Sequence, residues 1–380
     1  QPNSDNLPTL YVCPGEIHPI SKAIHYARLA AFYPKCRTCP FRRQTGNLTS
    51  DLKEKPEEID SPHDSLVTPS GLRGVYLNDI NRFRAAALAN GFVTLLHQGA
   101  LQERSTNDST IVVGYQEHSA APDLMIGVVN ALRATGVPIL DVGLTTDPEL
   151  SFAIRQPRAL GGIMVSGSGS DPAWIGLDFL LADGRPILDR DQLSQIETAQ
   201  TSPTFRLPHA QGGYCTWDVL PDYRESLTGL FHAMRPLRIG FGSSLKRLNH
   251  FAVELFEPLP CTFELIPLPH RRRQLHDPGD SDVHRLGEFV RERGLHLGIV
   301  CADDGRRIAL INDEGVLVPA DQWQTWLLEG ESPERIFSQT IGVQSSHVLP
   351  FEMDALVTLA AILSEMSRSD AQLSERLWSG

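Results

Sequence analysis

Short apolar segments alternate with amphipathic segments along most of this chain, and this alternation restricts the folds that it can adopt. Amphipathic helices are predicted at 81–98 and 122–135, and short buried strands at 110–115, 137–142 and 161–165. Strands that alternate with helices at this spacing are typical of a mostly parallel sheet that helices cover on both faces. We therefore predict an α/β fold.

The same alternation resumes after residues 198–213, a stretch with little apolar periodicity that marks a domain boundary. The later elements are strands at 237–241, 262–266 and 297–301, helices at 248–255, 282–294 and 354–365, and a hairpin formed by 307–312 and 316–318. The pattern therefore predicts α/β regions in tandem rather than one extended sheet.

Three of the six cysteines lie in a small unit at 1–46, which precedes a polar, proline-containing linker at 47–66. Cys36 and Cys39 form a Cys-x-x-Cys pair, and Cys13 offers a third sulfur. His18 is the predicted fourth ligand, with His25 as its competitor. This set suits a structural zinc ion. An iron–sulfur cluster would use the same thiolates, and a disulfide or three unrelated thiols are the alternatives without a metal.

Charge and hydropathy argue against several classes of function. The chain has 34 Lys and Arg against 46 Asp and Glu, a net charge of −12, whereas nucleic-acid binding needs clustered basic residues. No uncharged apolar run approaches the roughly 18 residues of a membrane-spanning helix, and the polar N-terminus does not have the pattern of a leader. We expect a cytoplasmic protein that binds neither nucleic acid nor membranes.

Four motifs follow one another in an informative order. They are SGLRGV at 70–75, GGIMVSGSGSDPAWIGLDFLLADGRPI at 161–187, LGIVCADDGRRIALINDEG at 297–315, and GVQSSHVLPFEMDALVTLAAILSEM at 342–366. Together they resemble the α-D-phosphohexomutase family, which includes phosphoglucomutases and phosphomannomutases. The resemblance implies tandem α/β/α domains with mixed or parallel sheets around a central cleft, at 67–200, 213–285 and 286–380, of which the third is shortened.

The resemblance also implies a two-step phosphoryl shuttle, in which a phosphoserine gives its phosphoryl group to a sugar phosphate and then recovers the other one. Ser168 matches the phosphoserine, with Ser170 as a second candidate if the alignment slips. Arg73 is assigned to catalysis with Ser168. Contacts with phosphate or sugar are predicted for Ser70, Ser166, Ser170, Arg307, Ser345 and His347. Alternatively, the turn around Ser168 binds a phosphate without chemistry, as glycine-rich turns do.

Other positions depart from the family's pattern. The family's Asn-Gly-x-Lys reads IGLD at 175–178, so that Asp178 replaces a cation. Its magnesium loop, Asp-Gly-Asp-Gly-Asp-Arg, reads ADDGRR at 302–307, in which Asp303 and Asp304 are the remaining candidate ligands of Mg²⁺. We expect the metal to be lost and both carboxylates to be solvated and paired with Arg306 and Arg307. Alternatively, Arg306 binds a phosphate in place of the metal. The basic run at 271–273 is expected to be a solvated loop face.

Two functions of different classes stay open. The altered motifs, and the expected absence of the family's fourth domain, favour a degenerate protein with weak or no catalysis that binds a sugar phosphate or acts as a scaffold for a protein partner. The retained Ser168, Arg73 and Arg307 favour an active phosphohexomutase, an isomerase that acts through a phosphoserine. Such an enzyme would take missing parts of its site from another copy in a homo-oligomer.

Overall fold

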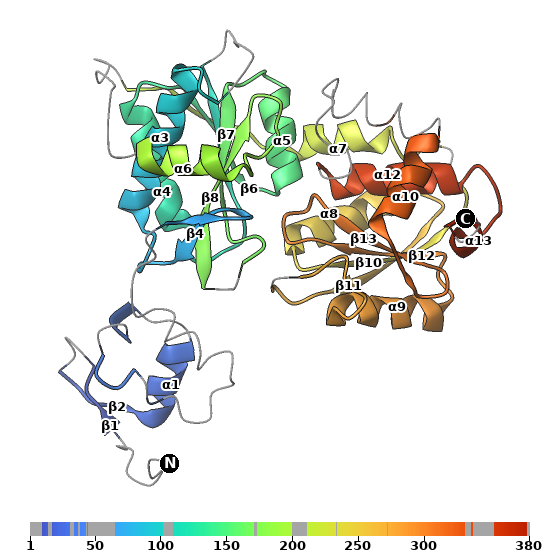
Figure 1. Ribbon diagram of the computed structural model, residues 1–380, viewed down its shortest axis with the longest axis horizontal. Helices are drawn as coiled ribbons and strands as arrows, with labels where there is room; N and C mark the ends of the chain where they lie inside the picture. The colour runs from blue at the N-terminus through green and yellow to red at the C-terminus, as the bar shows by residue number, and fades with distance from the viewer. Residues whose placement is uncertain are drawn as a thin grey trace.

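The computed structural model describes residues 10–13, 17–30, 34–36, 39–42, 44, 65–101, 109–170, 173–199, 211–232, 234–271, 273–330, 336 and 353–377. These ranges form a small N-terminal unit and two α/β domains, each built on one sheet (Figure 1). The predicted α/β fold is confirmed. None of the described helices has the length and apolarity of a membrane span.

The first domain has three layers, with a seven-stranded sheet between helices (Figure 1). In sheet order its strands are β3 (Val67–Thr68), β4 (Gly71–Val75), β8 (Trp174–Leu181), β7 (Gly161–Ser166), β5 (Ile111–Tyr115), β6 (Ile139–Leu144) and β9 (Tyr214–Thr216). β5, β6, β7 and β9 run parallel, whereas β8 pairs antiparallel with β4 and β7, and β3 pairs antiparallel with β4. The sheet is therefore mixed.

Two separate apolar cores cover the faces of this sheet. One face packs against α3 (Arg82–His97), α4 (Ala121–Ala134) and α6 (Arg190–Ala199), and the other against α5 (Asp147–Arg155). The helix expected at 81–98 begins after Asn81, whose side chain accepts hydrogen bonds from two backbone N–H groups of the first turn at 3.0 Å. Its buried Phe92 lies against Phe179 of β8, with 4.8 Å between the ring centroids. These contacts fix α3 on the sheet.

The second domain has a five-stranded sheet. In sheet order its strands are β11 (Thr262–Pro267), β10 (Arg238–Ser243), β12 (Leu297–Cys301), β13 (Ile308–Asn312) and β14 (Leu317–Val318). The first three are parallel, and β13 and β14 continue the sheet as an antiparallel hairpin. One face packs against α9 (Ser281–Arg293) and the other against α8 (Lys246–Phe256), α10 (Ala320–Glu329), α12 (Ala355–Met366) and α13 (Leu373–Leu377).

The domain divisions differ from those predicted. The division expected between residues 285 and 286 falls inside α9, and strands on both sides of it belong to one sheet. The described parts of 213–285 and 286–380 thus form one domain. Likewise, β9 lies beyond the expected end of the first domain at residue 200 but pairs with β6. In both cases, the pairing of strands that are distant in the sequence determines which domain a segment belongs to.

An apolar core joins the two domains. The α5 face of the first sheet is continuous with the α8 and α12 face of the second, through α7 (Leu220–Thr228). Tyr223 of α7 contacts Phe152 of α5 and Phe251 of α8, with centroid separations of 5.7 and 5.6 Å. Because of this packing, loops that follow the parallel strands of each sheet face one another at a single junction (Figure 1).

Candidate functional site

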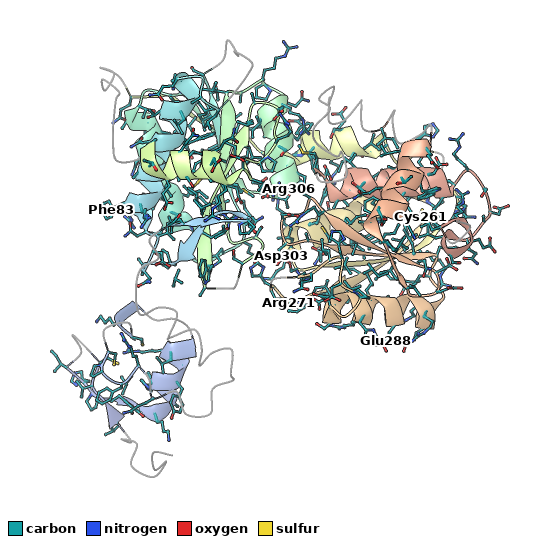
Figure 2. All side chains as sticks on the ribbon, viewed as in Figure 1. Phe83, Cys261, Arg271, Glu288, Asp303 and Arg306 are labelled. Atoms are coloured by element: carbon teal, nitrogen blue, oxygen red, sulfur yellow. The ribbon has the colours of Figure 1, made fainter. Side chains whose placement is uncertain are left out.

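Ser168, Asp303 and Asp304 lie at this junction between the domains, where Figure 2 labels Asp303 and Arg306. In the first domain, Gln116 follows β5, Asp147 follows β6, and the turn that contains Ser168 follows β7. In the second, Arg273 follows β11 and Asp303 follows β12. The carboxyl ends of parallel strands are where open α/β sheets bind ligands, so the fold itself places these side chains at a candidate binding site.

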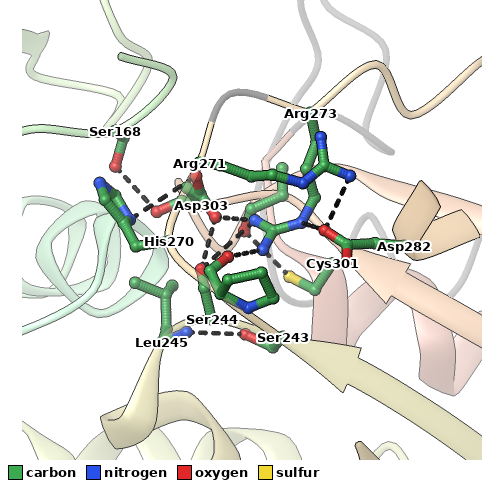
Figure 3. A network of polar contacts seen from close by, with 12 residues as sticks. Ser168, Ser243, Ser244, Leu245, His270, Arg271, Arg273, Asp282, Cys301 and Asp303 are labelled. Carbon is green, nitrogen blue, oxygen red and sulfur yellow. Dashed lines mark hydrogen bonds and ion pairs between the residues drawn. The ribbon is translucent and has the colours of Figure 1, made fainter. Parts of the chain in front are cut away.

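Ser168 is enclosed between the domains. Only 4% of the residue is exposed. Its backbone N–H donates to Ser166 Oγ at 3.0 Å. Its Oγ lies 2.8 Å from the carbonyl oxygen of Asp303 (Figure 3) and 2.7 Å from Oε1 of Gln116. A hydroxyl has one proton, so Ser168 donates to one of these two oxygens at a time. In this arrangement, Ser168 Oγ is enclosed by protein atoms rather than exposed to solvent.

Gln116 is the residue that links this turn to the rest of the junction, and its role was not predicted. Its Oε1 also accepts a hydrogen bond from Ser166 Oγ at 3.0 Å, and its Nε2 donates to Asp147 Oδ1 at 3.2 Å. The signal in the sequence was its place directly after a buried strand. Burial raises the pKa of Asp147 to about 7, since the opposing effect of Arg306 is smaller.

Arg73 forms a buried ion pair with Asp178. Nη2 of Arg73 lies 2.6 and 2.7 Å from the two carboxylate oxygens, and it reaches Ser166 Oγ at 3.4 Å. The pair fits because β4 and β8 are neighbours and because Gly71 has no side chain. A Cβ on Gly71, whose φ is +125°, would approach Asp178 Oδ1 to 2.3 Å. The anion at 178 therefore has an intramolecular partner.

The carboxylate of Asp303 is buried and points at basic residues of the second domain (Figure 3). Its Oδ1 accepts hydrogen bonds from Arg273 Nη1 and Ser244 Oγ, and its Oδ2 lies 3.7 Å from His270 Nδ1. Arg273 also bonds through Nε to Asp282 at 2.9 Å. Two expectations are corrected here: Asp303 is not solvated, and the side chain of Arg273 is not part of a solvated loop face, since only 2% of it is exposed.

Asp304 is buried as well, and its partners are those predicted. Its Oδ2 accepts a hydrogen bond from Arg307 Nε at 3.0 Å, and Arg306 Nη2 lies 3.8 Å away. Burial raises the pKa of Asp304, but the charges of Arg306 and Arg307 and the hydrogen bonds from their backbone N–H groups outweigh it, so the pKa is lowered. Arg306 also crosses the junction, with Nε 3.3 Å from Asp147 Oδ2.

The residues of this loop do not fit a magnesium ion. Mg²⁺ needs oxygen ligands in a nearly octahedral arrangement. Here Asp304 is held by guanidinium and backbone N–H groups, and one oxygen of Asp303 faces Arg273. Asp303 Oδ2 is buried without a hydrogen bond, and it lies 3.7 Å from His270 Nδ1. Within the described ranges, no group of three His, Cys, Asp or Glu side chains could hold a metal ion.

A cavity of about 390 Å³ opens beside this network, lined by Gly169 of the first domain and by Arg273, His276, Asp304 and Arg307 of the second, among others. The side chain of Arg307 is 51% exposed, so its guanidinium keeps access to the cavity.

Of the other predicted contact residues, Ser70 and Ser170 are half-buried. Ser70 lies beside the turn, since a Cβ on Gly169 would approach Ser70 Oγ to 2.6 Å. Ser345 and His347 lie outside the described residues.

A further ion pair crosses the junction between Glu149 of α5 and Arg247 of α8. Arg247 donates to both carboxylate oxygens, with contacts from 2.7 to 3.1 Å. Thr145 and Thr146 donate to the same carboxylate at 3.2 and 3.1 Å. Neither partner was singled out in the sequence, where they stand 98 residues apart.

The N-terminal unit consists of β1 (Leu10–Tyr11), β2 (Ile20–Ser21), α1 (Lys22–Ala30) and the short helix η1 (Pro34–Cys36). Cys13, Cys36 and Cys39 are free and buried, so none of them forms the alternative disulfide, and His18 is exposed. Burial raises the pKa of Cys36 to about 11, with smaller contributions from Cys13 and Cys39.

The predicted zinc site is not supported. The three thiols are near enough to influence one another, yet the described side chains do not converge as a set of metal ligands. His25, the alternative ligand, stacks on Tyr11 with 4.0 Å between the ring centroids, and its Nε2 lies 3.0 Å from the carbonyl oxygen of Gln44. The spacing of the cysteines thus places them in the same small unit, but it does not determine whether their side chains point at one metal ion.

Comparisons with known proteins place the first domain within a known family. Residues 65–206 match the family model for phosphoglucomutase/phosphomannomutase, alpha/beta/alpha domain I. Among curated proteins, the chain is 23% identical over 261 residues to a phosphoglucosamine mutase of Lacticaseibacillus casei, covering 66% of this chain and 56% of the relative. It is 24% identical over 330 residues to one of Picosynechococcus sp., covering 82% and 60%. The chain thus spans little more than half the length of these relatives.

Solved structures show the same fold. A phosphoglucomutase/phosphomannomutase family protein from Burkholderia thailandensis superposes with a TM-score of 0.64 at 18% identity, covering 80% of this chain and 78% of the other. A putative phosphomannomutase from Thermus thermophilus superposes with a TM-score of 0.59 at 18% identity, covering 83% of each chain. At 18% sequence identity, this similarity is evidence for a shared fold and for nothing further.

Proposed function

Because this chain is a member of the α-D-phosphohexomutase family, we propose that it binds a hexose phosphate at the junction between its two domains and catalyses little or no phosphoryl transfer. One observation carries the second half of this proposal: Ser168 is buried, and its Oγ is held between Gln116 and the Asp303 carbonyl. A nucleophilic hydroxyl must reach the phosphorus of a phosphoryl donor, and this hydroxyl has no such access.

Phosphate binding is supported by the cavity beside this turn. Arg307 offers a half-exposed guanidinium, and Gly169 of the glycine-rich turn also lines the cavity. A guanidinium binds phosphate oxygens well because its N–H groups form a planar fork. The named relatives are phosphoglucosamine mutases, so an aminohexose phosphate is the first ligand to test. A protein partner, a homo-oligomer and a cytoplasmic location stay predictions.

A second candidate function is an active phosphohexomutase. It is favoured by the position of Ser168, which lies in the turn after β7 and contacts Asp303 of the loop at 302–307 across the junction. In that reaction the bond from phosphorus to Ser168 Oγ breaks as a new bond forms to a hydroxyl oxygen of the hexose phosphate. The hydroxyl proton ends on Ser168 Oγ. The reverse transfer from the other position of the bisphosphate regenerates phosphoserine. Opening of the domain junction would have to precede both transfers.

Binding can be measured without catalysis. We expect glucosamine 6-phosphate to bind the wild-type chain in isothermal titration, and Arg307→Ala to weaken that binding about tenfold or more, since hydrogen bonds to charged groups contribute about 1.5–3 kcal/mol. Arg185→Ala is the matched control, because Arg185 pairs with Asp183 on the surface of the first domain and is not among the residues of the cavity. No binding by the wild type, or equal binding by Arg307→Ala, would contradict this assignment.

Phosphoryl occupancy distinguishes the two candidate functions. The chain is incubated with glucosamine, glucose and mannose 1,6-bisphosphates, and phosphate on the peptide at 161–187 is mapped by mass spectrometry beside a Ser168→Ala control. We expect no phosphate on Ser168, because the enclosed Oγ cannot reach a phosphoryl donor. Phosphate on Ser168 that disappears in Ser168→Ala would establish the active mutase instead.

A further inference from the structure

The loop at 302–307 aligns with a magnesium loop but carries guanidinium groups where a metal would supply positive charge. We propose that Arg273 and Arg306 replace the divalent cation in this chain, so that the junction folds and takes up its phosphorylated ligand without Mg²⁺. The ligand part of this inference rests on the proposed function, whereas the part that concerns the metal does not.

Arg273 satisfies the first carboxylate. It reaches Asp303 from the loop after β11, and its Nε binds Asp282 at 2.9 Å, so that two carboxylates share one buried cation. Ser244 Oγ donates to Asp303 Oδ1 as well (Figure 3). A buried carboxylate is tolerated only when a cation or several donors compensate for its lost hydration, and here the protein provides both.

Arg306 occupies the place of the third metal ligand itself. The resemblance aligns this position with an aspartate of the magnesium loop, and its side chain lies between Asp147 and Asp304, at 3.3 and 3.8 Å. The side chain is 9% exposed, so its charge acts at short range and is weakly screened. A metal ion at this point would have to displace a guanidinium from two buried carboxylates.

Arg273 and Arg306 also differ from Arg307 in how far their side chains are exposed. The side chains of Arg273 and Arg306 are buried against carboxylates of the junction, whereas that of Arg307 is half-exposed. Arg307 also pairs with Asp304, through Nε and Nη2 at 3.0 Å, but its half-exposed guanidinium can still meet an incoming phosphate. Arginine keeps its charge at every physiological pH, so this arrangement is permanent rather than dependent on metal supply.

Titration with Mn²⁺, followed by electron paramagnetic resonance of the free ion, tests the replacement without any sugar phosphate. We expect no saturable site in the wild type. Saturable binding of one Mn²⁺ per chain that is lost in Asp303→Asn would overturn the inference. Because the titration contains no sugar phosphate, its result does not depend on the proposed function.

Removing the guanidinium gives the converse test. We expect Arg273→Gln to leave Asp303 uncompensated and to gain stabilisation from Mg²⁺, seen as a rise in Tm of about 3 °C or more, whereas the wild type does not respond. Arg271→Gln is the control, because Arg271 lies on the same loop and pairs with Asp280 and Asp282 but not with Asp303. Where Arg273→Gln does not fold, Arg273→Lys keeps the charge and is expected to fold without Mg²⁺. A rise in the Tm of the wild type with Mg²⁺ would contradict the replacement.

The ligand part is tested by titrating glucosamine 6-phosphate in EDTA and in Mg²⁺. Equal affinities in the two buffers are expected. An affinity at least tenfold higher in Mg²⁺ would overturn it, and no binding in either buffer would refute the proposed function while leaving the Mn²⁺ result intact.

Discussion

Arg73→Ala is expected to lower the free energy of unfolding by about 3–5 kcal/mol, because it leaves the carboxylate of Asp178 buried without its cation. Arg73 is 1% exposed and lies between two neighbouring strands of the first sheet. The loss should appear in urea unfolding as a lower midpoint with an unchanged slope.

The double variant Arg73→Leu/Asp178→Leu distinguishes the effect of the unpaired buried charge from the effect of lost side-chain packing. Replacing both partners of a buried pair by apolar residues is often nearly neutral, so we expect this variant to recover much of the stability lost in Arg73→Ala. Arg185→Ala, which breaks an exposed pair with Asp183, should change the free energy of unfolding by less than about 1 kcal/mol.

This prediction decides between two roles for Arg73. The resemblance assigned Arg73 to catalysis, whereas its pairing with Asp178 gives it a structural role. Suppose that Arg73→Ala keeps the stability of the wild type and abolishes the binding of glucosamine 6-phosphate. Arg73 would then be a ligand-binding residue, and the ion pair would open when ligand binds.

Local elements were predictable because short stretches of sequence determine them. The strand predicted at 297–301 has those bounds, and the helix predicted at 81–98 begins at the Asn81 cap. The division into domains was not predictable in the same way. It depends on β9 pairing with β6 and on β12 pairing with β10, and neither contact leaves a local signal.

The candidate site shows the same limit. Motif order placed Ser168, Asp303 and Arg307 in one region, and the structure brings them to one junction. Their partners could not be predicted, since Asp178 stands 105 residues from Arg73 and Gln116 stands 52 residues from Ser168. A charge run such as 271–273 is usually solvated, and only the fold turns Arg273 inward.

Arg247→Ala is expected to destabilise the chain by about 3–5 kcal/mol, whereas Lys246→Ala, one residue earlier, should change stability by less than about 1 kcal/mol. Both side chains reach from α8 to a carboxylate of the first domain. Arg247 pairs with Glu149, which is 1% exposed, and Lys246 Nζ lies 2.8 Å from Glu117, with 81% and 51% of the two side chains exposed. The two pairs therefore have neighbouring positions on α8 and the same charges, and they differ in how deeply their carboxylates are buried.

Salt distinguishes the two pairs further. Raising the ionic strength screens the exposed Lys246–Glu117 pair and should leave the effect of Arg247→Ala nearly unchanged, because Glu149 stays buried and receives hydrogen bonds from two threonines. Lys246 is also the first residue of α8, where a cation opposes the helix dipole, so its net contribution is small. Urea unfolding of both variants at low and high salt measures this. Equal effects of Arg247→Ala and Lys246→Ala would show that the buried Glu149 pair does not stabilise the contact between the domains more than the exposed pair does.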